Sequence, residues 1–336
     1  MASKETQILD NIIASRRALL VGGGAALAAL AIPPAAKAAN TVTTYSDSDI
    51  LNFALNLEYL EANFYYLAAF GTNISTANTL YPTGAMVQGI TGTGTQGTVL
   101  VKPSPRVPFV NANIAAYCVE TAIEEGNHVN FLRTALGSAA VAQPQIDLMT
   151  SFNNLALAAG IGPAFDPFAS DANFLIGAYI FEDVGVTAYH GAAPLLVSKT
   201  YLAAAAGIMA VEAYHAGLVR TTINALDPTG ALGYIGLTQK ISTLRASLSK
   251  AVGPASSTYE TYPDDIPLSP GSALYSLAGA SAVTATNIVN ADQTNVIAFT
   301  RNTTQVLNIV TGGGAATAGA KATGIFYPNG LNGLFS

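Results

Sequence analysis

Charged residues and cysteine are scarce in this chain of 336 residues, and tryptophan is absent. Charged side chains make up 10% of it, and 14 lysines and arginines against 20 aspartates and glutamates leave a net charge of −6. So little basic charge excludes the basic surface that nucleic acids require, and we expect no nucleic-acid partner. The one cysteine, Cys118, excludes an intramolecular disulfide, and its apolar neighbours predict a buried, inert thiol. Half of the residues are apolar, which is enough for a sizeable core.

The N-terminus has the pattern of an export signal. Arg16 and Arg17 precede an apolar, Gly/Ala-rich run over 19–32, and a small-x-small sequence follows at 36–38. This pattern predicts that 1–38 is a twin-arginine signal peptide that is removed, and that the mature protein is periplasmic or secreted. The apolar run is short and glycine-rich for a membrane span, although an uncleaved anchor stays the alternative. After cleavage we expect no membrane partner.

Four long apolar segments have the length and composition of core helices. The first is apolar nearly all round, which predicts that it is buried on most sides. Gly71 and Gly137 are natural stops after the first and second segments, and Asp171 is a natural cap for the third. The pattern predicts helices at 49–70, 112–136, 171–192 and 194–225. We therefore expect an all-α fold over 39–250, an antiparallel four-helix bundle with a long crossover.

The connections between these helices are unusually long. Residues 71–110 are rich in Gly, Thr, Ser and Pro, which predicts a long insertion that can contain a small β-hairpin. Shorter helices are predicted at 145–159 and 237–250. From 251 the composition shifts toward Ser, Thr, Pro, Asn and Gly, so 251–336 is interpreted as a C-terminal extension packed on the bundle. Within it, the amphipathic segment 294–310 predicts a fifth helix.

Glutamates are concentrated in the apolar helices. Seven of the nine glutamates lie between Glu58 and Glu212, all in apolar helical segments. A carboxylate that is buried without a partner is costly and tends to take a proton. Arg133 and Arg220 are the only cations near them in sequence. A divalent metal would satisfy these acids, so the distribution favours a metal site.

The spacing of glutamate and histidine sharpens this prediction. Glu125 lies three residues before His128, and Glu212 lies three residues before His215. Residues three apart share one face of a helix, so each pair can bind a metal from one side. Arginine and threonine also recur at the same spacing after each pair, in 125–134 and 212–221, which predicts two related helix pairs in pseudo-twofold arrangement.

The first and third helices each add a glutamate. Glu182 is the candidate on the third helix, whereas the first helix offers both Glu58 and Glu61 on one face, and the choice between them stays open. A Glu from each of two helices plus Glu-x-x-His from the other two is the pattern that holds two iron or manganese ions in bundle cores. The predicted metal ligands are Glu58, Glu61, Glu125, His128, Glu182, Glu212 and His215.

Four further residues are candidates for contacts just behind these ligands: Glu124, Tyr65, Tyr189 and His190. Glu124 lies about 70° from the midpoint of its Glu-x-x-His pair. The two tyrosines follow the glutamates of their helices by seven residues, which allows a hydrogen bond to a carboxylate, although packing is favoured. His190 lies about 80° round the helix from Glu182, which favours a place behind the ligands or in the core over ligation.

At these residues the chain resembles a known family, the secreted ferritin-like domain proteins related to plant desiccation-related proteins. The resemblance rests on 50–55 and 58–65, Glu124 and Glu125 with His128, 181–189 and 212–215. It covers about 45–250 and implies the ferritin-like fold and, as in many relatives, a two-metal site. It implies no particular reaction, because one fold supports many functions. The long insertion and the doubled glutamate on the first helix depart from the family pattern.

Two functions from different classes follow from this pattern. The first is an exported protein with a dinuclear iron or manganese site, in redox chemistry with dioxygen or peroxide as a ferroxidase or a catalase-like enzyme. The alternative is a non-enzymatic stress-protective or surface interaction protein in which the metal is structural or absent. Metal storage in a hollow cage is a weaker third hypothesis. Whether the chain forms a homo-oligomer stays open.

Overall fold

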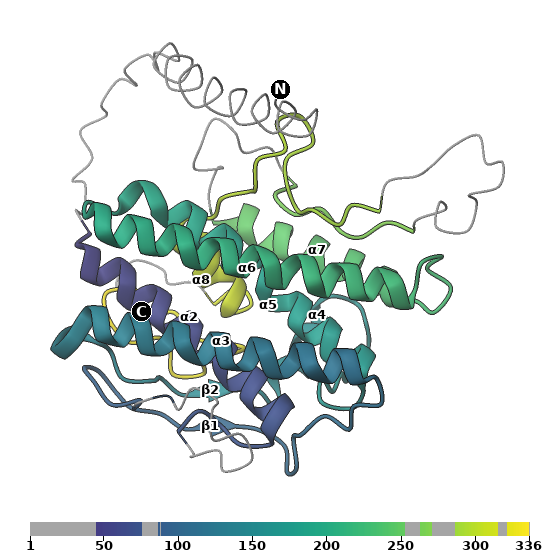
Figure 1. Cartoon of the computed structure of the whole chain (residues 1–336), viewed down its shortest axis with the longest axis horizontal. Helices are drawn as coiled ribbons and strands as arrows, with labels where there is room; N and C mark the ends of the chain where they lie inside the picture. Colours follow the sequence, from purple (N-terminus) through teal and green to yellow (C-terminus); the bar gives the residue numbers. More distant parts are fainter. Residues whose placement is uncertain are drawn as a thin grey trace, which may run out of the picture. The chain divides into compact units, whose positions relative to one another are not determined.

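A computed structural model describes residues 45–75, 87, 89–252, 263–270, 286–314 and 321–335. The predicted signal peptide at 1–38 lies outside these residues. Within them the chain is mainly helical, and the predicted all-α four-helix bundle is confirmed (Figure 1). Its four long helices are α2 (Asp47–Phe70), α3 (Ala112–Leu136), α5 (Asp171–Ala192) and α6 (Lys199–Leu226).

The bundle consists of two antiparallel helix pairs, α2 with α3 and α5 with α6. In the first pair, Asn52 near the start of α2 donates from Nδ2 to the carbonyl of Ala139, just beyond the end of α3, at 3.0 Å. In the second pair, Asp183 meets Arg220 at 2.7 Å, whereas Gly185 lies against Glu212. Later residues of α5 therefore contact earlier residues of α6, so this pair is antiparallel, as the first pair is.

Local side-chain caps decide where the long helices begin. Ser46 and Asp49 form a capping box that starts α2, two residues before the predicted boundary. Ser198 accepts from the backbone N–H of Tyr201 and starts α6 at Lys199. The preceding residues form a separate 3₁₀ turn, η2 (Ala193–Leu195), so the fourth helix is shorter at its start than predicted.

The insertion pairs with the crossover and forms no β-hairpin in the part of the chain that the structure describes. Strand β1 (Val99–Leu100) pairs in parallel with β2 (Ile146–Asp147). Two glycines permit the close approach: a Cβ at Gly92 would lie 2.2 Å from a crossover carbonyl, and a Cβ at Gly97 would lie 2.1 Å from a crossover amide nitrogen. A second 3₁₀ turn, η1 (Gly137–Ala139), leads from α3 into this crossover.

The shorter helices are α4 (Ser151–Ala158), α7 (Tyr234–Ala251) and α8 (Thr303–Val310). α4 starts later than predicted because β2 occupies the beginning of that segment. The predicted fifth helix at 294–310 is reduced to α8. Asp292 accepts hydrogen bonds from the backbone amides of the loop before it, and a capping box at Asn302 then starts the helix.

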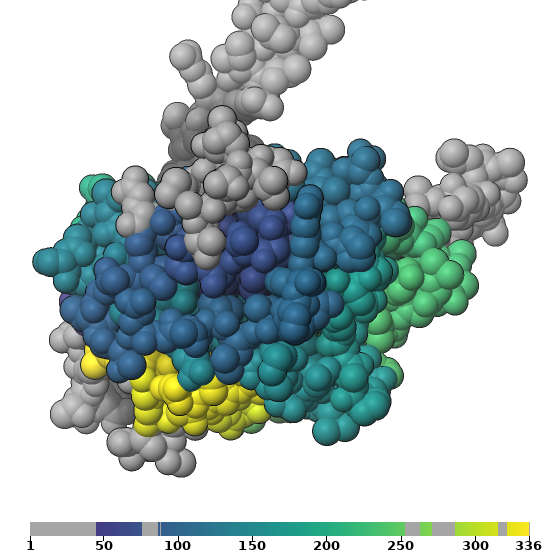
Figure 2. All heavy atoms as spheres, turned by 90° about the horizontal axis from the view of Figure 1, so that it is seen from below, coloured from purple at the N-terminus to yellow at the C-terminus, as the bar shows by residue number. Residues whose placement is uncertain are grey.

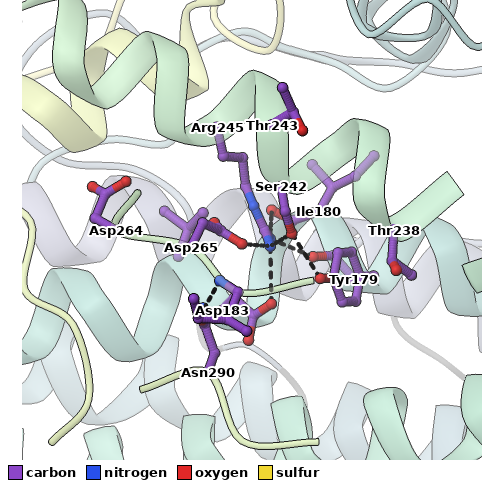
Figure 3. A network of polar contacts seen from close by, with 12 residues as sticks. Tyr179, Ile180, Asp183, Thr238, Ser242, Thr243, Arg245, Asp264, Asp265 and Asn290 are labelled. Atoms are coloured by element: carbon purple, nitrogen blue, oxygen red, sulfur yellow. Dashed lines mark hydrogen bonds and ion pairs between the residues drawn. The ribbon is translucent and has the colours of Figure 1, made fainter. Parts of the chain in front are cut away.

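The described part of the C-terminal extension is tied to α5 and α7 by buried charges. Arg245 on α7 lies 2.9 Å from Asp183 on α5 and 2.8 Å from Asp265 of the extension (Figure 3). Arg301 lies 3.0 Å from Asp265, and its backbone N–H donates to the carbonyl of Thr187 at 3.0 Å. These contacts hold the extension against the side of the bundle that carries α5.

The last described residues cover α2 and meet the insertion. The Tyr327 hydroxyl donates to the carbonyl of Asn56 at 2.8 Å, and Asn332 exchanges hydrogen bonds with both Asn56 and Thr95. Figure 2 shows this yellow C-terminal segment beside the blue segment that includes the insertion. Because α2 is covered in this way, 20 of its residues are buried, as its apolar sequence predicted.

By length and composition alone, α6 is the described helix that could cross a membrane. Its Glu212, His215 and Arg220 are buried in contacts with other bundle helices. A core helix of a bundle passes the same test. We therefore treat α6 as a bundle helix.

Candidate metal centre

The four bundle helices bring six of the predicted ligands together at the centre of the bundle. Two overlapping groups of donor atoms form there, and within each group the atoms lie within 4.8 Å of one another. Glu125 and Glu212 belong to both groups. One group adds Glu58 and His128, and the other adds Glu182 and His215.

The first group surrounds the Nδ1 atom of His128. This nitrogen lies 3.3 Å from Glu58 Oε2, 3.4 Å from Glu125 Oε2 and 3.5 Å from Glu212 Oε1. Ligands bound to one ion at about 2.1 Å lie roughly 3 to 3.4 Å from their neighbours. The spacing of these atoms is therefore that of donors arranged around a common centre.

The second group surrounds the Nδ1 atom of His215. It lies 2.9 Å from Glu125 Oε1 and 3.5 Å from Glu182 Oε2. The other ring nitrogen, Nε2, lies 2.7 Å from Glu124 Oε2. Glu124 thus contacts the far side of the imidazole, as a residue behind a ligand does, and fixes which nitrogen faces the carboxylates.

The donor atoms are buried and lack hydrogen-bond partners, which is the test of whether a metal fits. Among the described residues, eight side-chain atoms of this cluster make no hydrogen bond. An orphaned buried polar atom is costly in a folded protein, and metal coordination removes that cost. The atoms are Glu58 Oε2, both carboxylate oxygens of Glu125 and of Glu212, Glu182 Oε2, and the Nδ1 atoms of His128 and His215.

Burial and mutual repulsion act on the carboxyls. Burial raises the pKa of Glu58 to about 7 even though His128 lies beside it. Burial also raises the pKa of Glu182, and it raises that of Glu212 well above its ordinary value, with repulsion from Glu125 adding to the shift. Without a cation these acids therefore hold protons at neutral pH or repel one another.

The pKa values of Glu125 and of the two histidines shift in the direction that favours their charged forms. Burial disfavours the charged form of Glu125, but attraction by His128 and His215 outweighs it and lowers the pKa of this carboxyl. Burial likewise disfavours the charged imidazoles, yet the neighbouring glutamates raise the pKa of both histidines. The cluster thus attracts positive charge, which in the metal-free chain only protons can supply.

Two tyrosines support the carboxylates across the bundle. Tyr65 on α2 donates its hydroxyl to Glu182 Oε1 on α5, and Tyr189 on α5 donates to Glu58 Oε1 on α2. The sequence favoured packing for both side chains, and the hydrogen bonds appear only in the folded bundle. The reciprocal pattern follows from the spacing, since each tyrosine lies seven residues after the glutamate on its own helix.

The remaining predicted residues lie outside the two donor groups. Glu61 is buried, and burial together with repulsion from Glu212 raises its pKa well above the ordinary value, but no oxygen of Glu61 joins either group. His190 lies elsewhere: its Nδ1 is 3.3 Å from the carbonyl of Phe299 in the extension. Glu58 is thus the α2 glutamate that the fold brings to the donor atoms.

One contact at the centre has no clear signal in the sequence. Gly185 packs directly on Glu212, and a Cβ at this position would lie 2.3 Å from Glu212 Oε2. A glycine inside a helix is the only hint, and it indicates close packing without naming the partner.

Comparisons with known proteins show which family the chain is similar to. Residues 46–225 match the family described as the ferritin-like domain. The chain is 32% identical to the desiccation-related protein PCC13-62 of Craterostigma plantagineum over 212 residues, which cover 60% of this chain and 62% of that protein. It is 25% identical to the ferritin-like catalase Nec2 of Nesocodon mauritianus over 296 residues, which cover 86% of this chain and 84% of that protein.

No solved structure matches the chain. The family match covers more than half of the chain, and it includes all four bundle helices except the last residue of α6. The buried cluster of carboxylates and histidines is compatible with a two-metal site of the kind found in such bundles. The resemblance to ferritin-like proteins related to desiccation-related proteins is confirmed, and the chain belongs to the ferritin-like domain family.

Proposed function

We propose that the chain holds two divalent ions, iron or manganese, and uses them in redox chemistry with a small oxidant, peroxide or dioxygen. The observation that carries the proposal is the sharing of Glu125 and Glu212 between two donor groups. Carboxylates can bridge two hard cations, so shared glutamates are what a two-ion site requires. The charge of the site also supports two ions, since four carboxylates balance two divalent cations.

The residues have distinct roles in this proposal. Glu125 and Glu212 would bridge the ions, Glu58 and His128 would complete one of them, and Glu182 and His215 would complete the other. When bound, the ions would supply the redox chemistry by exchanging electrons with the oxidant. The chain holds the ligands in place through the two tyrosine hydroxyls and excludes water, because all six ligands are buried.

Peroxide disproportionation is the reaction that one of the two relatives favours. The match to the ferritin-like catalase extends over 86% of this chain. The desiccation-related relative favours the second candidate, a non-enzymatic stress-protective role. The two candidates differ in what they require: peroxide chemistry needs two redox-active ions, whereas a protective bundle needs no bound metal.

The export of the protein is part of the proposal. The twin arginines Arg16 and Arg17 and the small-x-small sequence at 36–38 support it. Replacing both arginines with lysine should retain the protein in the cytoplasm of a host that has a twin-arginine pathway, and cell fractionation would measure this. Equal export of the two forms would contradict this route.

The test of the metal centre is elemental analysis of the purified mature protein, followed by a peroxide assay. We expect about two ions of iron or manganese per chain and oxygen release from peroxide. The double variant H128A/H215A should lose the metal and the activity, whereas H190A, a histidine outside the donor groups, should keep both.

Two results would contradict the proposal in different ways. If the mature protein contains no metal and takes up neither Fe(II) nor Mn(II), the enzyme proposal fails and the protective role stands. If the H128A/H215A variant keeps its full metal content, the assignment of these ligands is wrong.

A further inference from the structure

An apolar cavity of about 50 Å³ lies between α4, α5 and α7. Its walls are aliphatic and aromatic side chains, among them Leu60, Phe152, Leu155, Ile176, Ile241 and Leu244. Half-buried residues also line it, among them Ile161 and Phe165 after α4 and Leu248 on α7. None of these residues has a role in the metal centre.

The inner end of the cavity reaches the metal centre. Glu61 on α2 and Gly185 on α5 both line it. Gly185 has no side chain, and its other neighbour is the carboxylate of Glu212, which belongs to both donor groups. Gly185 therefore contacts both the cavity and a candidate bridging ligand.

The size of the cavity limits what it can hold. Apolar cavities of about 150 Å³ lined by Leu, Ile and Phe stay free of water and bind benzene or xenon. This cavity is about a third of that volume, so it admits a molecule of two or three heavy atoms and excludes an organic substrate.

The polarity of the cavity selects among small molecules. A buried water needs two to four polar partners, and peroxide would leave its hydroxyls without hydrogen bonds in such a site. The polar residues in the wall are Glu61 and Arg245, and the terminal nitrogens of Arg245 are engaged by Asp183, Asp265 and the carbonyl of Tyr179. An apolar diatomic molecule loses no hydrogen bond on entering.

We propose that this cavity binds dioxygen and holds it beside the metal centre, as the route by which dioxygen reaches or leaves the site. The functional role rests on the proposed function, since only a redox centre uses dioxygen. The binding of a small apolar gas rests on the cavity alone. The two parts can therefore be tested separately.

Xenon is the probe, because it is apolar and similar in size to dioxygen. Its binding to a single cavity can be detected. The purified mature protein, metal-free and metal-loaded, would be measured by xenon NMR, and crystals under xenon pressure would locate the site. We expect one xenon in this cavity in both forms. The variant A156L places extra carbons in the cavity and should lower xenon binding at least tenfold, since Ala156 is a buried lining residue on α4.

The matched control is A158L, the same change at an exposed position of the same helix outside the cavity wall. It should bind xenon as the unmodified protein does. In the metal-loaded, reduced protein, the reaction with dissolved dioxygen should be several-fold slower in A156L than in A158L, at equal metal content.

The outcomes separate the two parts of the proposal. Absence of xenon from this cavity in the unmodified protein would overturn the proposal, whatever the folding of the variants. Xenon loss in A156L with an unchanged rate of dioxygen reaction would refute the role as a route. A protein that takes up no metal but binds xenon would refute the proposed function and leave the gas site standing.

Discussion

The bundle contains two buried charge clusters that meet on α5, where Glu182 and Asp183 are neighbours in sequence. Glu182 belongs to the metal centre, which combines four glutamates with two histidines. Asp183 belongs to what we call the arginine–aspartate network, in which three arginines meet three aspartates: Arg220, Arg245, Arg301, Asp183, Asp264 and Asp265. Both clusters are buried, but only one balances its own charge.

Hydrogen bonding differs in the same way. In the described residues of the network, the charged side chains leave two buried atoms without a hydrogen bond, Arg245 Nε and Asp264 Oδ1. The metal centre leaves eight. A buried cluster whose charges and hydrogen bonds close on themselves holds structure together, whereas one with excess acid and orphaned donors needs a ligand.

The pKa directions show the same contrast. Burial disfavours the charged form of Asp265, but Arg245 and Arg301 outweigh it and keep the pKa of this carboxyl below its ordinary value. Burial raises the pKa of Glu212 well above its ordinary value, and Glu125 adds to that shift. The network therefore stabilises the ionised form of Asp265, whereas the metal centre disfavours the ionised form of Glu212 until a cation is present.

The largest expected effect separates shared from unshared ligands of the metal centre. E125A should lower the metal content from about two ions per chain to nearly none, because Glu125 belongs to both donor groups. E58A should leave about one ion, since Glu58 belongs to a single group. Elemental analysis measures both, with E120A as a control at an exposed glutamate of α3. Equal losses in E125A and E58A would contradict the bridging role.

The next largest effect is expected from a substitution that breaks the arginine–aspartate network. D183N removes the carboxylate that faces two buried arginines and should cost about 3 to 5 kcal/mol of unfolding free energy. Urea denaturation of the metal-free protein measures it. The control is D166N, whose pairing with Lys102 is partly exposed and should contribute about 0 to 1 kcal/mol. Similar costs for the two variants would refute the structural role of the network.

A steric change tests the wall between α5 and Glu212. G185A places a Cβ within 2.3 Å of Glu212 Oε2, so the carboxylate must shift and metal affinity should fall at least tenfold. Competition with a chelator measures the affinity. The control G207A has open space around its Cβ on α6 and should keep the affinity while stabilising the helix by about 0.5 to 1 kcal/mol. Unchanged affinity in G185A would show that Glu212 is not held where the fold places it.

A smaller effect tests the asymmetry between the two histidines. Glu124 lies behind His215, whereas the equivalent position on α6 is Val211, so His128 has no such carboxylate from its matching residue. E124Q should lower the affinity for one of the two ions about tenfold and leave the affinity for the other unchanged. Metal titration that resolves two binding steps measures this. An equal change in both steps would remove the asymmetry.

A further contrast concerns the pH dependence of stability in the metal-free chain. Asp265 has a lowered folded pKa, so its contribution is present above the unfolded value of about 3.9 and is lost as pH falls below it. Glu58 has a raised pKa of about 7, so the folded state binds more protons than the unfolded state between about pH 4.5 and 7. Stability should therefore fall as pH rises through that window.

Denaturation across pH separates these two contributions. D265N should flatten the loss of stability below about pH 4, and E58Q should flatten the decline between about pH 4.5 and 7. If E58Q left the decline above about pH 4.5 unchanged, the burial of an ionisable Glu58 would be refuted.

Part of this architecture follows from short-range patterns. The glycine stop at Gly71 and the bounds of α3 and α5 agree with the sequence prediction. The α8 helix shows the limit, because amphipathic spacing predicted a helix from 294, whereas the Asp292 turn and the Asn302 cap delay its start to Thr303. Local spacing predicts which faces are apolar, but competing hydrogen bonds decide how far a helix extends.

The sequence by itself determined that each Glu-x-x-His pair shares a helix face, because residues three apart are neighbours in any α-helix. It could not choose between Glu58 and Glu61, since both lie on one face of α2, and the choice depends on where α3 and α6 place His128 and Glu212. Nor could it pair Tyr65 with Glu182, because that hydrogen bond joins residues 117 positions apart. The tertiary structure decided these contacts, since distance across the bundle is set by helix packing and not by spacing along the chain.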